Sequence, residues 1–118
     1  IYVHRLVHEA GYDTEIVPGV PSFCAVAAKL QQPLCEKDEA LIVIPGNNAH
    51  RKELLALEGS KVIMKPSGRL APIQEELRDL QLLDKASMIE RCGLPGEGVY
   101  EKAADAKETG YFAVLLVK

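Results

Sequence analysis

The chain of 118 residues has no excess of basic side chains and no long apolar run. Its 14 Lys and Arg residues are outnumbered by 17 Asp and Glu residues, which gives a formal net charge of −3. Basic and acidic residues are interleaved, so the sequence offers no cationic surface for the phosphates of nucleic acid. No stretch approaches the roughly 18 apolar residues of a membrane-spanning helix, and no signal segment opens the chain. We expect a cytoplasmic protein that binds neither nucleic acid nor membranes.

Cysteine is scarce as well, and its three copies form no metal or disulfide pattern. Cys24, Cys35 and Cys92 are an odd number without CxxC spacing, which favours neither a disulfide framework nor a zinc site. Cys24 falls near a predicted helix start, but its apolar neighbours disfavour a thiolate, and we expect buried, inert thiols there and at Cys92. The motifs GxGxxG, GxSxG and the Walker sequence do not occur.

Two short clusters of polar side chains could bind a ligand, although each has a simpler structural interpretation. His4 and His8 have the spacing of zinc ligands on one helix face, yet no third ligand is evident, so we expect a solvated or interface-facing surface. The basic residues of segment 50–52 begin a predicted helix and could form an anion site. Because exposed cations tolerate a helix amino terminus at a small cost, we expect a surface role instead. No protein-bound metal is expected.

The spacing of apolar residues predicts helices alternating with strands. The predicted helices cover residues 2–10, 21–31, 50–57 with a cap at Asn48, and 70–80. The predicted strands cover residues 14–17, 40–45, 61–64, 87–91, 99–101 and 112–117. The apolar run at 40–45 is typical of a strand covered on both faces. Early alternation predicts parallel pairing and the short later connections predict antiparallel hairpins, so the fold class is α/β: a mixed parallel and antiparallel sheet of about five strands flanked by helices.

The amino-terminal residues have the pattern of the last helix of an upstream segment. The chain begins at Ile1 instead of Met, and residues 2–10 already have helical spacing before Gly11. We therefore expect a fragment, in which residues 1–12 are the end of an N-terminal domain or a connecting helix. Residues 13–118 are then one C-terminal domain, because that length is common for a single core.

The segment VPGVPS at 17–22 joins a predicted strand to a helix rich in small side chains. Open α/β sheets bind ligands at the carboxyl ends of strands, where helix amino termini offer free amides. Most turns of this kind bind nothing, so the residues alone leave a structural turn and a binding loop both open.

Four segments in order along the chain together resemble the tetrapyrrole methylase family. They are VPGVPS with the QPL that follows at 32–34, KVIMK at 61–65, ERCGLPGE at 90–97 and the closing strand FAVLLV at 112–117. Pro21, Phe23, the Lys65-Pro66 pair and Tyr111 depart from the commoner residues of the family. The residues at these positions are similar to those of the branch of the family that methylates carbon 20 of precorrin-2.

The resemblance implies an S-adenosyl-L-methionine-dependent methyltransferase of cobalamin biosynthesis, with precorrin-2 or its cobalt complex as the tetrapyrrole substrate. Such proteins hold the cofactor in a cleft between two domains and are typically homodimers. The resemblance assigns cofactor contacts to Pro21, Ser22, Phe23, Met64, Cys92, Gly93, Phe112 and Ala113. No catalytic residue is assigned, because methyl transfer depends mainly on holding the reacting atoms in line.

Two other functions remain open at this level. The chain could be a non-catalytic assembly or dimerisation domain that binds no cofactor by itself. It could also be an unrelated small α/β binding protein with a chance Pro-Gly loop, although agreement at several ordered positions argues against coincidence.

Overall fold

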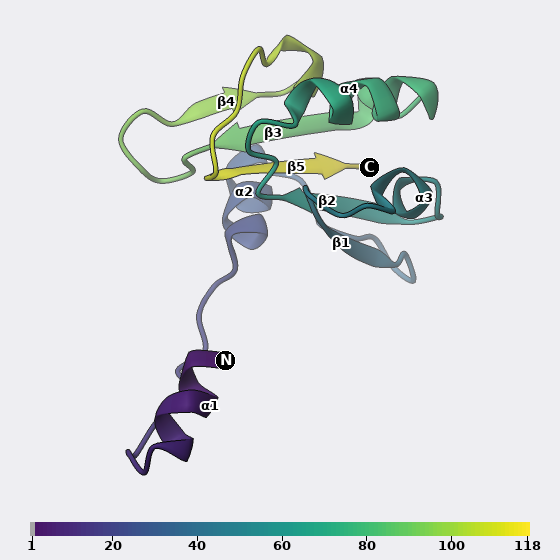
Figure 1. The fold of residues 1–118 in the computed structure, drawn as a ribbon. Helices are drawn as coiled ribbons and strands as arrows, with labels where there is room; N and C mark the ends of the chain where they lie inside the picture. Colours follow the sequence, from purple (N-terminus) through teal and green to yellow (C-terminus); the bar gives the residue numbers. More distant parts are fainter. Residues whose placement is uncertain (1) are drawn as a thin grey trace.

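The computed structural model describes residues 2–118, which form a five-stranded mixed sheet with helices on both faces (Figure 1). The strands are β1 (Leu41–Pro45), β2 (Ser60–Met64), β3 (Ala86–Glu90), β4 (Gly98–Tyr100) and β5 (Ala113–Val117). The helices are α1 (Tyr2–Glu9), α2 (Ser22–Leu30), α3 (Arg51–Leu55) and α4 (Leu70–Asp79), with short 3-10 turns η1 (Leu83–Lys85) and η2 (Ala103–Asp105). The predicted α/β class is confirmed.

The strand order is β1-β2-β5-β3-β4, so the last strand in the chain lies in the middle of the sheet. β1 and β2 run parallel, and β3 and β4 form the expected antiparallel hairpin. The expected hairpin between β4 and β5 does not form. Instead β5 pairs antiparallel with β2 and β3 and leaves β4 at the edge. All five residues of β5 are buried, whereas Val99 of β4 is exposed, so burial of apolar surface favours β5 at the centre.

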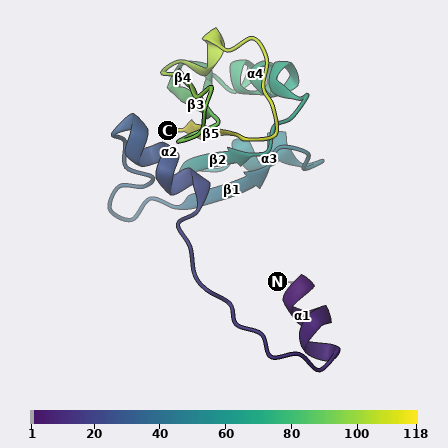
Figure 2. The same cartoon turned by 90° about the vertical axis from the view of Figure 1, so that its left-hand side faces the viewer.

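The strand predicted at 40–45 forms as β1 but lacks the expected cover, and the strand predicted at 14–17 does not form. The segment 40–45 is not covered on both faces, because β1 is an edge strand whose Leu41 and Val43 face solvent. Residues 14–17 form no strand, since this extended segment lies outside the sheet with no neighbouring strand to pair with (Figure 2). An apolar β-branched run indicates an extended backbone, but its pairing and cover depend on tertiary neighbours.

The sheet separates two apolar clusters. α3 and α4 cover one face, where Ile63, Leu77 and Leu115 belong to the larger cluster. α2 covers the other face, where Val26 and Ala27 meet Val62, Ile89, Val114 and Leu116. Successive residues of β2 and β5 contribute to opposite clusters, as the period-two geometry of a strand requires.

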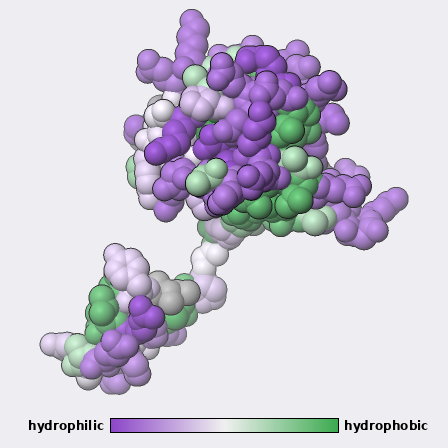
Figure 3. Space-filling model, turned by 45° about the vertical axis from the view of Figure 1, so that its right-hand side comes forward, coloured by the Kyte–Doolittle hydropathy of each residue, from purple (hydrophilic) through white to green (hydrophobic). Residues whose placement is uncertain are grey.

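Residues 2–20 project from this body (Figures 2 and 3). α1 has no buried residues, and the extended segment that joins it to α2 exposes Ile16, Val17 and Val20. His4 and His8 stack on one face of α1 with ring centroids 6.0 Å apart, as their spacing predicts. Among residues 2–118, no group of three or more His, Cys, Asp or Glu side chains is arranged to hold a metal, and no helix is long and apolar enough to cross a membrane.

Arg51 corrects the expected surface role of segment 50–52. Its side chain is buried, and its guanidinium donates two hydrogen bonds of 2.7 Å to the carboxylate of Glu76 on α4 and a third to the carbonyl of Gly46. The neighbouring His50 and Lys52 are exposed, as predicted. The pair of Arg51 and Glu76 therefore joins α3 to α4, and the segment presents no free anion site at Arg51.

Candidate functional site

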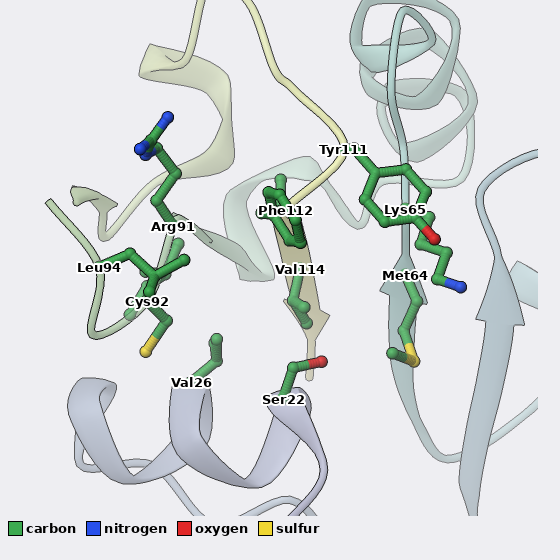
Figure 4. A pocket seen from close by; sticks show the side chains of 12 residues that line it. Ser22, Val26, Met64, Lys65, Arg91, Cys92, Leu94, Tyr111, Phe112 and Val114 are labelled. Carbon is green, nitrogen blue, oxygen red and sulfur yellow. The ribbon is translucent and has the colours of Figure 1, made fainter. Parts of the chain in front are cut away.

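An apolar pocket opens at the end of the sheet where β2 and β3 finish and β5 begins (Figure 4). Because β5 is antiparallel to both neighbours, its first residues meet their carboxyl ends: Val114 lies opposite Met64, and Ala113 lies opposite Glu90. The amino-terminal part of α2 closes the pocket from one face of the sheet. This is the edge at which open α/β sheets bind ligands.

Twelve residues from four parts of the chain line a cavity of about 340 Å³. They are Ser22, Val26, Met64, Lys65, Ile89, Arg91, Cys92, Leu94, Tyr111, Phe112, Ala113 and Val114. Figure 4 shows Met64 and Lys65 on one side and Arg91, Cys92 and Leu94 on the other, with Ser22 and Val26 below. Most of the lining is apolar, which suits a ligand with a flat hydrophobic ring.

The sequence prediction agrees with this pocket at five positions. Ser22, Met64, Cys92, Phe112 and Ala113 all line it. The remaining three expected residues, Pro21, Phe23 and Gly93, are chain neighbours of lining residues but do not line the cavity. Contact with a cofactor stays a prediction for all eight residues.

Several lining residues were not anticipated from the sequence. Val26 lies one helical turn after Ser22, and Ile89 and Val114 are strand residues on the α2 face. Spacing of four on a helix could have indicated Val26 from Ser22, and spacing of two on a strand could have indicated Val114 from Phe112. The convergence of the three elements, however, depends on the central position of β5.

The backbone turns sharply on both sides of the pocket. Lys65 follows β2 and Arg91 follows β3, and both have left-handed backbone angles, with φ of 55° and 54°. Such angles are uncommon for residues with a Cβ and typically occur in turns or at functional sites. These angles turn the backbone away from the strand direction after β2 and after β3. The Nε of Arg91 also donates a hydrogen bond of 2.8 Å to the carbonyl of Pro95.

The β3–β4 loop is held against α2 by Glu97. Its carboxylate accepts a hydrogen bond of 2.7 Å from the amide of Gly93 and pairs with Lys29 at 2.9 Å. The pKa of the Glu97 carboxyl is lowered below its ordinary value, most strongly by the hydrogen bond from the Gly93 amide and next by Lys29. The loop carrying Cys92 and Leu94 is thus fixed at the pocket by a side chain that does not line it.

Tyr111 and Phe112 form an aromatic wall at the pocket mouth. Their rings meet edge to face with centroids 5.3 Å apart, and the ammonium of Lys65 lies 5.2 Å from the centroid of the Tyr111 ring. Both rings are more than half exposed. Exposed aromatic surface beside a cavity is available for a ligand to cover.

The pocket contains no acid–base pair among its described lining residues. Cys92 is half-buried at the wall, as is Cys24 on α2, so the expected full burial of these thiols is wrong. Cys92 follows the end of β3, where few neighbouring layers enclose it, and Cys24 lies in the first turn of α2 beside exposed residues. The arrangement can bind and orient a ligand, and the described residues offer no nucleophile–base pair.

This geometry defines the class of the protein as an α/β domain with a ligand pocket at the ends of its strands. The chain belongs to the family of tetrapyrrole (corrin/porphyrin) methylases, which matches residues 1–107. It is 37% identical to the cobalt-precorrin-2 C(20)-methyltransferase of Salmonella typhimurium, over 87% of this chain and 46% of that protein. It is 31% identical to the precorrin-2 C(20)-methyltransferase of a Sinorhizobium species, over 98% of this chain and 49% of that protein.

The solved structures that resemble the chain have the same fold. A cobalt precorrin-4 methyltransferase superposes with a TM-score of 0.74 at 18% identity, covering 96% of this chain and 55% of that one. A uroporphyrin-III C-methyltransferase from Thermus thermophilus, complexed with S-adenosylhomocysteine, superposes with a TM-score of 0.68 at 21% identity, covering 96% and 56%. The chain therefore spans about half the length of the relatives that it matches.

Proposed function

We propose that this chain is the C-terminal half of a methyltransferase that uses S-adenosyl-L-methionine to methylate carbon 20 of precorrin-2 or its cobalt complex, in cobalamin biosynthesis. In this proposal residues 13–118 are the C-terminal domain, residues 1–12 connect it to an N-terminal domain, and the complete protein is a cytoplasmic homodimer. The observation that carries it is the strand-end pocket, which collects five of the eight residues expected to contact the cofactor. The similarity to C(20)-methyltransferases supports the choice of substrate.

The pocket fits part of such a cofactor. Its volume of about 340 Å³ is at the lower end of the roughly 300–1,000 Å³ typical of ligand pockets. The apolar floor formed by Val26 and Val114 and the exposed ring of Phe112 suit a flat adenine-like ring. A larger cofactor therefore needs further walls, which is consistent with a site completed by a second half.

The residues of this chain would bind and orient the reactants. Ser22, Met64, Cys92, Phe112 and Ala113 would hold the cofactor, which supplies an already activated methyl group. Alignment of the reacting atoms is then the main demand on the protein, and proximity of this kind is worth up to about 7–11 kcal/mol. The lack of an acid–base pair in the described lining is compatible with such a role.

Calorimetric titration with S-adenosylhomocysteine tests the proposal. The ligand is added to the 118-residue chain and to a chimera that carries the N-terminal half of the Salmonella typhimurium relative. We expect the chimera to bind and the shorter chain to bind weakly or not at all. Val26→Phe, which fills the pocket floor, is the control variant and abolishes binding if the pocket is the site. A folded chimera that does not bind would contradict the proposal, and transfer of labelled methyl to precorrin-2 tests the substrate.

A second candidate function, assembly without cofactor binding, is favoured by the exposed apolar surface of the amino-terminal segment. Val17 and Val20 are 76% and 81% exposed, and Tyr2 is 70% exposed. Apolar surface of this kind typically marks an interface. Sedimentation over a range of concentrations tests association, and titration of the chimera distinguishes the two functions, since an assembly domain associates but gives a folded chimera that does not bind S-adenosylhomocysteine.

A further inference from the structure

We propose that Glu90 is a positioning residue that holds the aromatic wall of the pocket in place through the amide of Gly110. The proposal rests on the proposed function and deepens it, because Glu90 itself does not line the cavity. It acts through the segment of residues 107–112, called here the strap, which ends in Tyr111 and Phe112. Figure 1 shows this segment descending from η2 to the start of β5.

The strap has few attachments to the sheet. Within residues 2–118, its backbone makes two hydrogen bonds to other parts of the fold, from the amide of Arg91 to the carbonyl of Phe112 at 2.6 Å and from the amide of Gly110 to Oε1 of Glu90. A hollow lined by Glu90, Tyr100, Asp105, Lys107 and Glu108 separates the strap from the β3–β4 hairpin. Two consecutive residues at the end of β3 therefore fix the part of the strap next to the pocket.

The strand geometry explains why a side chain is needed at this point. β3 and β5 are paired as far as Glu90 and Ala113, and the bond between Arg91 and Phe112 continues the ladder by one step. Arg91 then adopts its left-handed backbone angle and β3 turns away, so no strand amide or carbonyl remains for Gly110. The carboxylate of Glu90 supplies the missing acceptor, and an amide bonded to a charged acceptor makes one of the stronger hydrogen bonds.

Gly110 fits this contact closely. A Cβ added at Gly110 would lie 2.9 Å from Oε1 of Glu90, so the carboxylate at the end of this flexible side chain would have to shift. No left-handed backbone angle is required at this glycine, so alanine would change only the space beside the carboxylate. The other side-chain anchor of the region, Gln74, donates to the carbonyls of Ala103 and Ala106 and holds the residues immediately before the strap. Glu90 is thus the anchor nearest to Tyr111 and Phe112.

The test uses the S-adenosylhomocysteine-binding chimera with Glu90→Ala, Glu90→Gln and Gly110→Ala. Amide exchange at residue 110 and the Kd for S-adenosylhomocysteine are measured for each. Glu108→Ala is the matched control, because it removes an exposed carboxylate from the same strap without a hydrogen bond to lose. We expect Glu90→Ala to speed exchange at Gly110 and to weaken binding, each about tenfold, which is the loss typical of a hydrogen bond to a charged group. Glu90→Gln, which keeps an acceptor oxygen, stays within about threefold of the parent, and Glu108→Ala has no effect.

Gly110→Ala is the second variant if Glu90→Ala does not fold, since it displaces the Glu90 carboxylate from the other side of the contact. It should speed exchange at residue 110 and weaken binding, each by less than Glu90→Ala does, because the amide is kept and the carboxylate can shift. Unchanged exchange at Gly110 in Glu90→Ala, or faster exchange with unchanged ligand affinity, would overturn the positioning role. A parent chimera that binds no ligand refutes the proposed function instead, and the exchange measurement still decides whether Glu90 holds the strap.

Discussion

Replacement of Phe112 by alanine is the sharpest test of the pocket as a ligand site. The side chain is 63% exposed in the absence of ligand. An aromatic side chain has about 150–250 Å² of surface, so roughly 120 Å² of Phe112 is free, and a ligand lying against one ring face would cover about 60 Å². At about 25 cal/mol per Å² this burial contributes about 1.5 kcal/mol, and stacking adds about 0.5–1.5 kcal/mol. A loss of about 2 kcal/mol raises the Kd about thirtyfold.

The assay is calorimetric titration of the chimera with S-adenosylhomocysteine, together with thermal unfolding. Leu57→Ala is the matched control, because Leu57 is also half exposed but does not line the pocket. Neither change should lower stability by more than about 0.5 kcal/mol, since both side chains are largely in solvent. A change in Kd of less than about twofold in Phe112→Ala would show that the ligand does not lie against this ring, and the reasoning from the exposed wall would be refuted.

Three further predictions concern the structure that supports the pocket. Glu76→Ala leaves the buried guanidinium of Arg51 without its carboxylate partner. The change should lower the free energy of unfolding by about 3 kcal/mol, as measured by urea denaturation. A loss below about 1 kcal/mol would contradict the importance of this pair. The pKa of the Glu97 carboxyl is lowered in the folded state. The stability that Glu97 gives to the loop is therefore fully present above the pKa of an unfolded glutamate, near 4.3. It is lost as the pH falls through the lower pKa of the folded state. In an NMR titration Lys29→Ala should therefore raise the Glu97 midpoint, and an unchanged midpoint would show that the ion pair has no influence. Gly46→Ala places a Cβ 2.7 Å from the backbone after β2 and should destabilise the fold by about 1–3 kcal/mol in the same urea assay, unless that turn can shift.

Local pattern was sufficient for most of the elements. The helices at α1, α2 and α4 and the strands at β2, β3 and β5 lie within a residue or two of their predicted bounds, because each has a clear period in its apolar residues. The errors occur where the pattern was ambiguous. The run at 40–45 is apolar throughout, whereas 14–17 includes Thr14 and Glu15. In both cases only the tertiary neighbours decide the outcome, an edge strand for the first and an unpaired segment for the second.

The pocket shows the same division. The family resemblance indicated eight contact residues. Five of them, Ser22, Met64, Cys92, Phe112 and Ala113, line the pocket although they are up to 91 positions apart in a chain of 118. Spacing along the chain could not reveal that Lys65, Arg91 and Tyr111 join them, because that depends on the turns after β2 and β3. Nor could it reveal Glu90, whose role follows from the hydrogen bond to an amide 20 residues away.

The sequence by itself determined the α/β class, most of the helices and strands, and the segments that resemble tetrapyrrole methylases. These features depend on local periodicity and on short motifs, which are written in neighbouring residues. Only the tertiary structure decided that β5 lies between β2 and β3, and so which strand ends meet at the pocket. It also decided that Arg51 is buried against Glu76. The physical reason is that strand order and the pairing of buried charges depend on contacts between residues far apart in the chain, which compete for the same core.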